Sequence, residues 1–202
     1  MEYGIQRRNI YLVPPEGDDL LWLFEQFDAP EVWQMFGFPG PSRLKIMRAY
    51  RSGNVVTSIL KRVSDRHRLG FVVMFPPAQD FDFWEFGYAI PDVRDRDAFS
   101  ALNATDAMAH YMFEHLRVEA MGWRTRADNT KADAVVRRLG YVPFGDWTVD
   151  GHHYTFYRLD QAGWAKRRAK LDKGEASHPS GLGDTFITLG ERPFEPVVPE
   201  AE

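Results

Sequence analysis

Short apolar runs alternate with longer stretches of helical spacing along most of the chain. Runs bounded by turn residues predict strands at 9–13, 55–63, 69–75, 81–90, 123–127, 147–149, 153–158 and 186–189. Apolar positions that repeat with helical spacing predict helices beginning near Asp18, Pro30 and Ser42, and further helices over 97–117, 129–139 and 161–173. This succession of strands and helices indicates a mixed α/β fold.

Two local signals place boundaries within this pattern. Gly140 follows the last apolar position of a predicted helix, where the chain commonly turns through a left-handed residue. The dipeptide Asp150-Gly151 lies between two strand-like runs and predicts a two-residue hairpin turn.

The composition changes after the last strand of this hairpin. A basic helix is followed by a stretch rich in Gly, Ser and Pro over 174–185, and the final residues are rich in Pro and Glu. We therefore predict one domain over 1–160, with a C-terminal helix and extended arm over 161–202.

Composition excludes several classes of function. A net charge of −4 gives no general attraction to nucleic acid or anionic membrane. The absence of cysteine excludes disulfides, thiolate metal sites and a cysteine nucleophile. No apolar run approaches the roughly 20 residues that span a bilayer, and the first residues do not form a secretory signal. We expect a cytoplasmic protein without nucleic-acid or membrane partners.

The most specific motifs lie between Glu85 and Tyr141. In order, they are Glu85-Phe86-Gly87-Tyr88-Ala89-Ile90-Pro91, then Arg96-Asp97-Ala98-Phe99-Ser100-Ala101, Asp128-Asn129-Thr130 and Arg138-Leu139-Gly140-Tyr141. Ala101 and Asn129 are separated by 129 − 101 = 28 residues, which accommodates a helix, a turn and a strand. This order resembles the GNAT superfamily of acyl-CoA-dependent N-acyltransferases, in the branch that includes the ribosomal-protein N-terminal acetyltransferases.

The resemblance covers residues 5–159 and implies both a fold and an activity. The expected fold is a mixed, mostly antiparallel central sheet flanked by helices, followed by a C-terminal extension. The expected activity is transfer of an acetyl or other acyl group from acyl-CoA to a primary amine, such as a peptide N-terminus or a small molecule. The resemblance implies acetyl-CoA as co-substrate and no metal.

Members of this family hold the CoA pyrophosphate with an R-x-x-G-x-A motif at the start of the long helix. The corresponding residues here are Arg96, Asp97, Ala98, Phe99, Ser100 and Ala101, with Phe99 in the glycine position. A helix N-terminus offers unpaired N–H groups and a partial positive charge to phosphate, and glycine allows close approach. Asp97 is alternatively an N-cap that takes the same N–H groups, and Phe99 a residue packed beneath the helix.

The resemblance implies further roles at the reacting centre. Glu85 corresponds to the general base, and its apolar neighbours Trp84 and Phe86 favour a raised pKa. The other interpretation is a partly buried glutamate paired with an arginine. Backbone N–H groups of Tyr88, Ala89 and Ile90 are expected to polarise the thioester carbonyl.

Two positions of the following helix bear on the same chemistry. Asn129 is expected to contact the pantetheine arm, to cap its helix, or to do both. The family's tyrosine general acid corresponds to Val136, so Tyr141 is the candidate replacement, with Tyr88, Tyr154 or solvent as alternatives.

Other motifs carry weaker signals. His152-His153 lacks a matching carboxylate spacing for a metal site. Gly181-Leu182-Gly183-Asp184 lacks the strand and helix of a phosphate loop. Lys166-Arg167-Arg168 suggests either an RNA contact or the solvated face of a terminal helix, and we favour the solvated face.

Two further functions stay open at this point. One is a domain of the same fold that has lost catalysis and serves binding or assembly, with the arm contributing to a homodimer. The other is an acyltransferase that takes its thioester from an acidic carrier protein bound at the basic helix around 164–170.

Overall fold

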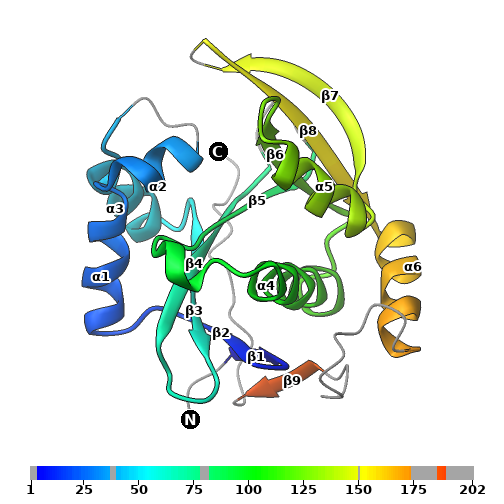
Figure 1. Cartoon of the computed structure of the whole chain (residues 1–202), viewed down its shortest axis with the longest axis horizontal. Coiled ribbons are helices and arrows are strands. Elements are labelled where there is room, and N and C mark those ends of the chain that lie inside the picture. Colours follow the sequence, from blue (N-terminus) through cyan, green and yellow to red (C-terminus); the bar gives the residue numbers. More distant parts are fainter. Residues whose placement is uncertain (1–3, 37–39, 78–81, 150, 174–185, 190–202) are drawn as a thin grey trace.

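The computed structural model describes residues 4–36, 40–77, 82–149, 151–173 and 186–189. These residues form one sheet of nine strands in the order β7-β8-β6-β5-β4-β3-β2-β1-β9 (Figure 1). The strands are β1 (Gly4–Arg7), β2 (Ile10–Val13), β3 (Val56–Arg62), β4 (Arg68–Phe75), β5 (Trp84–Ala89), β6 (Ala120–Arg126), β7 (Val142–Val149), β8 (His152–Asp160) and β9 (Phe186–Leu189). The pairing of β5 with β6 is parallel and the other described pairings are antiparallel, which confirms the mixed, mostly antiparallel sheet.

Helices cover both faces of this sheet. They are α1 (Asp18–Gln26), α2 (Pro30–Met35), α3 (Arg43–Arg51), α4 (Ala98–His110), α5 (Thr130–Arg138) and α6 (Gln161–Asp172). One core, which we call the α1-side core, packs residues of α1, α2 and α3 against the sheet. The α4-side core packs residues of α4, α5 and α6 against the opposite face. Figure 1 shows α1, α2 and α3 grouped together, away from α4.

Alternation along the strands assigns side chains to the two cores, because successive residues of a strand point to opposite faces. On β5, Phe86 belongs to the α4-side core and Ala89 to the α1-side core. On β6, Met121 and Trp123 belong to the α4-side core. Glu85 and Arg124 therefore point toward the side of the sheet that carries α1, α2 and α3.

Several elements differ from the sequence prediction. The chain begins with a hairpin, because β1 precedes the predicted strand and Arg8 makes the turn with a φ of 52°. The strand predicted over 81–90 is observed as the shorter β5, and Phe81, the first residue of the predicted range, lies outside the described part. The long helix ends at His110 and continues as a π-helical turn over Tyr111–His115. Gly140, with a φ of 94°, follows α5 as predicted.

The C-terminal helix packs against the domain. Trp164 and Leu171 are buried in the α4-side core, and Trp164 Nε1 donates a hydrogen bond to Glu114 at 2.9 Å. The predicted strand at 186–189 is confirmed as β9, which pairs with β1. The glycine-rich stretch 174–185, which contains Gly181-Leu182-Gly183-Asp184, lies outside the described residues.

A buried ion cluster joins α6 and β1 to α4. The guanidinium of Arg167 donates to both carboxylate oxygens of Asp106, over 2.9 and 2.8 Å. Arg7 Nε lies 3.6 Å from the same carboxylate. Arg167 is therefore not part of a solvated face, so that interpretation of the basic run is wrong for this residue. None of the described helices is long and apolar enough to cross a membrane.

Candidate functional site

The parallel strands β5 and β6 form a fork. They pair at Trp84–Met121 and at Glu85–Gly122, and among the described residues they do not pair beyond these positions. The later residues of β5 pair with β4, and those of β6 with β8. Beyond the branch point, one edge of each strand therefore faces the space between them, and its backbone N–H and C=O groups make no hydrogen bonds to the other strand. Tyr88 and Ala89 lie on this part of β5.

Glu85 lies at the branch point of this fork, beside Arg124. Arg124 Nε is 2.7 Å from Glu85 Oε1, and both side chains are 20% exposed. Burial raises the pKa of the Glu85 carboxyl, and the Arg124 charge opposes that rise. The structure thus agrees with the alternative interpretation of Glu85, a partly buried glutamate paired with an arginine.

Arg124 has two further neighbours on this face of the sheet. Its guanidinium lies over the ring of Tyr154, 5.6 Å from the centroid, and one of its N–H groups is 3.4 Å from the carbonyl oxygen of Phe36. The ring of Phe36 also lies against the backbone of Gly87. Phe36, which directly follows α2, and residues of β5, β6 and β8 therefore surround the Glu85–Arg124 pair.

Aromatic rings fill the other face of the fork. Trp123 packs edge-to-face against Tyr88 at 5.4 Å and against Tyr141 at 6.0 Å between centroids. Burial raises the pKa of Tyr88 to about 12 and also raises the pKa of Tyr141. The Tyr141 hydroxyl is buried and has no hydrogen-bond partner among the described residues. Both phenols therefore keep their protons at neutral pH.

The first turn of α4 is capped by Asp97. Its Oδ1 accepts hydrogen bonds from the backbone N–H groups of Phe99 and Ser100, over 2.8 and 2.7 Å. The Ser100 hydroxyl donates to Oδ2 over 2.6 Å. The geometry confirms the N-cap interpretation of Asp97 and assigns the Ser100 hydroxyl to the same carboxylate. The helix begins at Ala98, and Ala101, at the end of its first turn, is buried.

Phe99 and Arg96 flank this cap. The side chain of Phe99 is 44% exposed, so the expectation that it packs beneath the helix is wrong. Arg96 donates to the carbonyl oxygens of Ile90 and Pro91, over 2.7 and 2.8 Å. Arg96 thereby fixes the end of β5 to the start of α4, and Ile90 contributes its carbonyl to this contact.

A 3₁₀ turn, η1 (Val93–Asp95), lies between these two elements. Arg94 pairs with Asp92, with Nε 3.0 Å from Oδ1. Asp95 accepts from Arg62 at 2.8 Å and from the His67 ring at 2.9 Å, so it attaches the turn to the β3–β4 hairpin. The charged residues at the start of α4 thus neutralise one another.

Asn129 caps α5. Its Oδ1 accepts from the N–H of Ala132 at 3.1 Å, which agrees with the N-cap interpretation. Val136, in the position of the family's tyrosine, is fully buried in the α4-side core.

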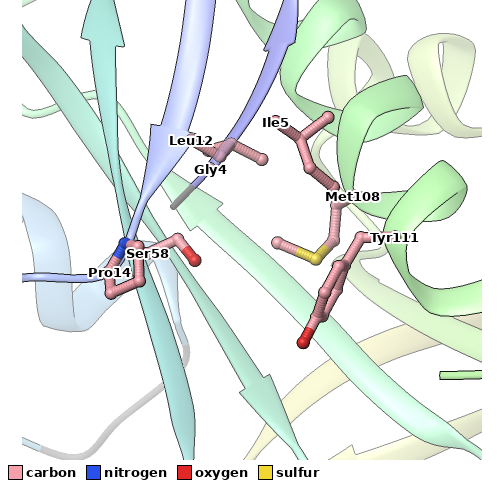
Figure 2. Close-up of a pocket in the computed structure, with 7 residues that line it drawn as sticks. All are labelled: Gly4, Ile5, Leu12, Pro14, Ser58, Met108 and Tyr111. Carbon is pink, nitrogen blue, oxygen red and sulfur yellow. The ribbon is translucent and has the colours of Figure 1, made fainter. Parts of the chain in front are cut away.

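The remaining candidates lie away from the fork. His153 Nδ1 is 3.0 Å from the Thr148 hydroxyl, and no group of His, Asp and Glu side chains in the described part could hold a metal ion. Figure 2 shows a small apolar pocket whose lining includes Ser58 on β3 and Met108 on α4. None of the predicted site residues lines it.

Sequence reasoning missed Arg124. The residue lies in a predicted strand, and nothing in its local sequence distinguishes it from the neighbouring arginine Arg126, which pairs with exposed Asp128 at 2.7 Å. The signal that identifies Arg124 is its register. Gly122 pairs with Glu85, so Arg124 lies two residues further along the adjacent strand and on the same face.

Comparisons with known proteins agree with this architecture. Residues 9–142 match the family model described as an acetyltransferase (GNAT) domain. No curated protein matches the sequence.

Solved structures resemble the fold at low sequence identity. A GNAT-family acetyltransferase from Bacillus anthracis is 13% identical, with a TM-score of 0.64 over 79% of this chain and 99% of that one. Spermidine N-acetyltransferase from Vibrio cholerae, in complex with CoA and spermine, is also 13% identical, with a TM-score of 0.64 over 78% and 98%. An aminoglycoside acetyltransferase in complex with coenzyme A is 11% identical, with a TM-score of 0.63 over 79% and 98%.

Proposed function

Since the chain belongs to the acetyltransferase (GNAT) domain family, we propose that it moves an acetyl group from acetyl-CoA to a primary amine by direct attack. The fork between β5 and β6 supports this proposal most strongly, because Glu85 lies at its branch point and unpaired strand edges extend beyond it. A pantetheine arm is an extended chain with two amides, and such a chain hydrogen-bonds to a free strand edge. The thioester would then lie between the strands, near Tyr88, Ala89 and Ile90.

Glu85 is the proposed general base. It would take a proton from the acceptor ammonium, directly or through one water, so that the neutral amine attacks the thioester carbonyl. The Arg124 charge favours the ionised carboxylate that accepts this proton, while burial raises its pKa and so increases its basicity. The C–N bond forms and the C–S bond of the resulting tetrahedral intermediate breaks. The nitrogen loses its second proton to solvent, the thiolate gains a proton, and the amide and CoA thiol are released.

Tyr141 is the proposed proton donor to the leaving thiolate. Its buried hydroxyl has no hydrogen-bond partner among the described residues, so its donor is not engaged by the protein. It packs against Trp123 on the α4 side of the fork, whereas Glu85 faces the α1 side. Base and acid on opposite faces suit an amine that attacks from one side and a sulfur that leaves from the other.

Acceptor recognition is proposed for the α1 side of the fork. The structural neighbours named above include a spermidine and an aminoglycoside acetyltransferase, which is consistent with an amine acceptor here. A hollow on the β7–β8 hairpin is lined partly by Asp146, His153 and Tyr154. The Tyr154 ring contacts Arg124 and borders the Glu85–Arg124 pair, whereas the side chains of Asp146 and His153 lie on the opposite face of the hairpin.

The proposal is tested by thiol release from acetyl-CoA in the presence of a panel of amines. The panel contains peptide N-termini, lysine, polyamines, amino sugars and aminoglycosides, and mass spectrometry identifies the acetylated product. We expect turnover with at least one amine and loss of that turnover in Glu85→Gln. No product with any amine, together with no binding of CoA, would refute the proposal.

A catalytically inactive binding domain is the second candidate. The Asp97 carboxylate on the first turn of α4 and Val136 in the tyrosine position favour it. It predicts no acetyl transfer to any amine of the panel by the folded protein. A carrier-protein donor is less favoured, because Arg167 is buried against Asp106 and Arg168 pairs with Asp172 at 3.1 Å.

Three finer assignments accompany the proposal. They are membership of the branch that includes the ribosomal-protein N-terminal acetyltransferases, a cytoplasmic location, and a homodimer formed through the C-terminal arm. Size-exclusion chromatography with light scattering would test the dimer, and truncation after Lys173 would test the contribution of the arm.

A further inference from the structure

The N-terminus of α4 is already occupied by a carboxylate of the chain, that of Asp97. Helix N-termini attract phosphate because their first N–H groups have no intrahelical acceptor. In this chain the Asp97 carboxylate accepts from two of those groups, at Phe99 and Ser100, and from the Ser100 hydroxyl. Two of the backbone N–H groups that a diphosphate would need are therefore bound to a carboxylate of the chain itself.

The nearby arginines are engaged in the same way. Arg96 donates to two backbone carbonyl oxygens, Arg94 pairs with Asp92, and Arg62 pairs with Asp95. An incoming diphosphate would have to break these contacts and would meet the negative charge of Asp97 at close range. Burying or crowding like charges costs binding free energy.

The β5–β6 fork is not affected by this arrangement. Its unpaired strand edges lie beyond Glu85 and Gly122, and no residue of β5 or β6 takes part in the Asp97 hydrogen bonds described above. We infer that Asp97 acts as a built-in substitute for the donor's diphosphate, so that the protein recognises its thioester through the pantetheine arm and gains little from the nucleotide portion. This inference rests on the proposed function and adds a donor preference to it.

The test compares two ligands by isothermal titration. They are CoA, which carries the diphosphate, and reduced pantetheine, which ends before it. The wild-type protein is expected to bind both with dissociation constants within about tenfold of each other, because the diphosphate finds its hydrogen-bond donors occupied. A preference for CoA of more than about tenfold would overturn the inference.

Variants at the cap give the second arm of the test. Asp97→Ala frees the two N–H groups and removes the charge, so CoA should bind about tenfold more tightly while pantetheine binding stays the same. Asp97→Asn retains an oxygen that caps the helix but removes the charge, and should give a smaller gain for CoA. Unchanged or weaker CoA binding in both variants would overturn the inference.

A matched control separates this effect from simple loss of a helix cap. Asp160 caps α6 through a 2.7 Å hydrogen bond from the Gly163 N–H, and it lies at the opposite end of β8 from the Tyr154 contact with Arg124. Asp160→Ala should cost similar stability without changing the affinity for CoA. If the wild-type protein binds neither ligand, the proposed function itself fails, whereas a strong preference for CoA contradicts this inference alone.

Discussion

Arg124 Nε lies 2.7 Å from Oε1 of Glu85, and the two side chains meet across the parallel pairing of β5 and β6. Each side chain is 20% exposed, so the pair is partly shielded from water but open to a ligand. Burial and the arginine act in opposite directions on the pKa of the glutamate. Burial has the larger effect, so the pKa of the Glu85 carboxyl is raised and the group is more basic than an exposed glutamate.

Replacing Glu85 by Gln should lower kcat by about a hundredfold, because a positioned general base contributes at least that factor. The amide keeps the size and part of the hydrogen bonding of the carboxylate, so KM for the thioester should change little. Steady-state kinetics would measure both constants. Glu25→Gln, at an exposed position of α1, is the control and should leave both unchanged. Equal activity of the two variants would remove Glu85 from the mechanism.

Replacing Arg124 by Met should move the acid limb of the kcat/KM profile to higher pH. The arginine lowers the pKa of Glu85, so its loss leaves burial unopposed and the pKa rises. The ionised form that accepts the proton then requires a higher pH. Arg124→Lys keeps the charge and should shift the limb less. A limb that stays in place in Arg124→Met would show that another group controls the profile.

Replacing Tyr141 by Phe should lower kcat by about tenfold or more without loss of stability. The buried hydroxyl has no described partner, and an unpaired buried hydroxyl costs folding free energy, so its removal should be neutral or stabilising. Thermal unfolding and steady-state rates measure the two effects. Tyr88→Phe and Tyr154→Phe are the comparisons. A larger rate loss in either of them would transfer the acid role to that tyrosine.

Replacing Gly122 by Ala should destabilise the fork by about 1–3 kcal/mol. A Cβ at this position would clash with the ring of Phe83, which is 2% exposed and has little room to move. Urea unfolding would measure the loss. The double variant Gly122→Ala, Phe83→Leu should recover part of it, because the smaller side chain makes room. A Gly122→Ala protein as stable as the wild type would contradict the packing described for this strand.

Replacing Arg167 by Met should cost about 3 kcal/mol or more in urea unfolding, since it removes the bidentate partner of the buried Asp106 carboxylate. The adjacent Arg168 provides a control in the same helix. It pairs with Asp172, whose side chain is 53% exposed, and Arg168→Met should cost less than about 1 kcal/mol. Equal costs at the two positions would argue against a buried ion cluster.

Much of the fold could be predicted because its signals are local. Gly140 marks a helix end through a backbone preference that needs no tertiary context. The Asp150-Gly151 signal predicted a hairpin, and β7 does pair with β8, while Asp150 itself lies outside the described residues. The apolar run at 186–189 identified β9 at the far end of the chain. By contrast, β1 was missed because it is four residues long and its turn uses Arg8 at a positive φ, where glycine or asparagine is the usual signal.

The site was less predictable because it depends on register and burial. Glu85 and Arg124 are 39 residues apart (124 − 85 = 39), and they meet through a parallel pairing whose alignment no short motif encodes. The basic run at 166–168 resembles a solvated helix face, yet Arg167 is buried because Asp106 on α4 accepts both of its hydrogen bonds. The Asp97 cap was predictable, since Asp is among the residue types preferred at the N-cap position of a helix.

The buried carboxylate of Asp106 couples local unfolding at two distant parts of the chain. It contacts Arg7 near the beginning of the chain and Arg167 on the last described helix, so one buried charge on α4 fastens both. When either segment unfolds locally, Asp106 loses one of its two arginine partners while it is still buried, which costs free energy. Local unfolding of β1 and local unfolding of α6 are thereby coupled, so a substitution that weakens one of them also destabilises the other.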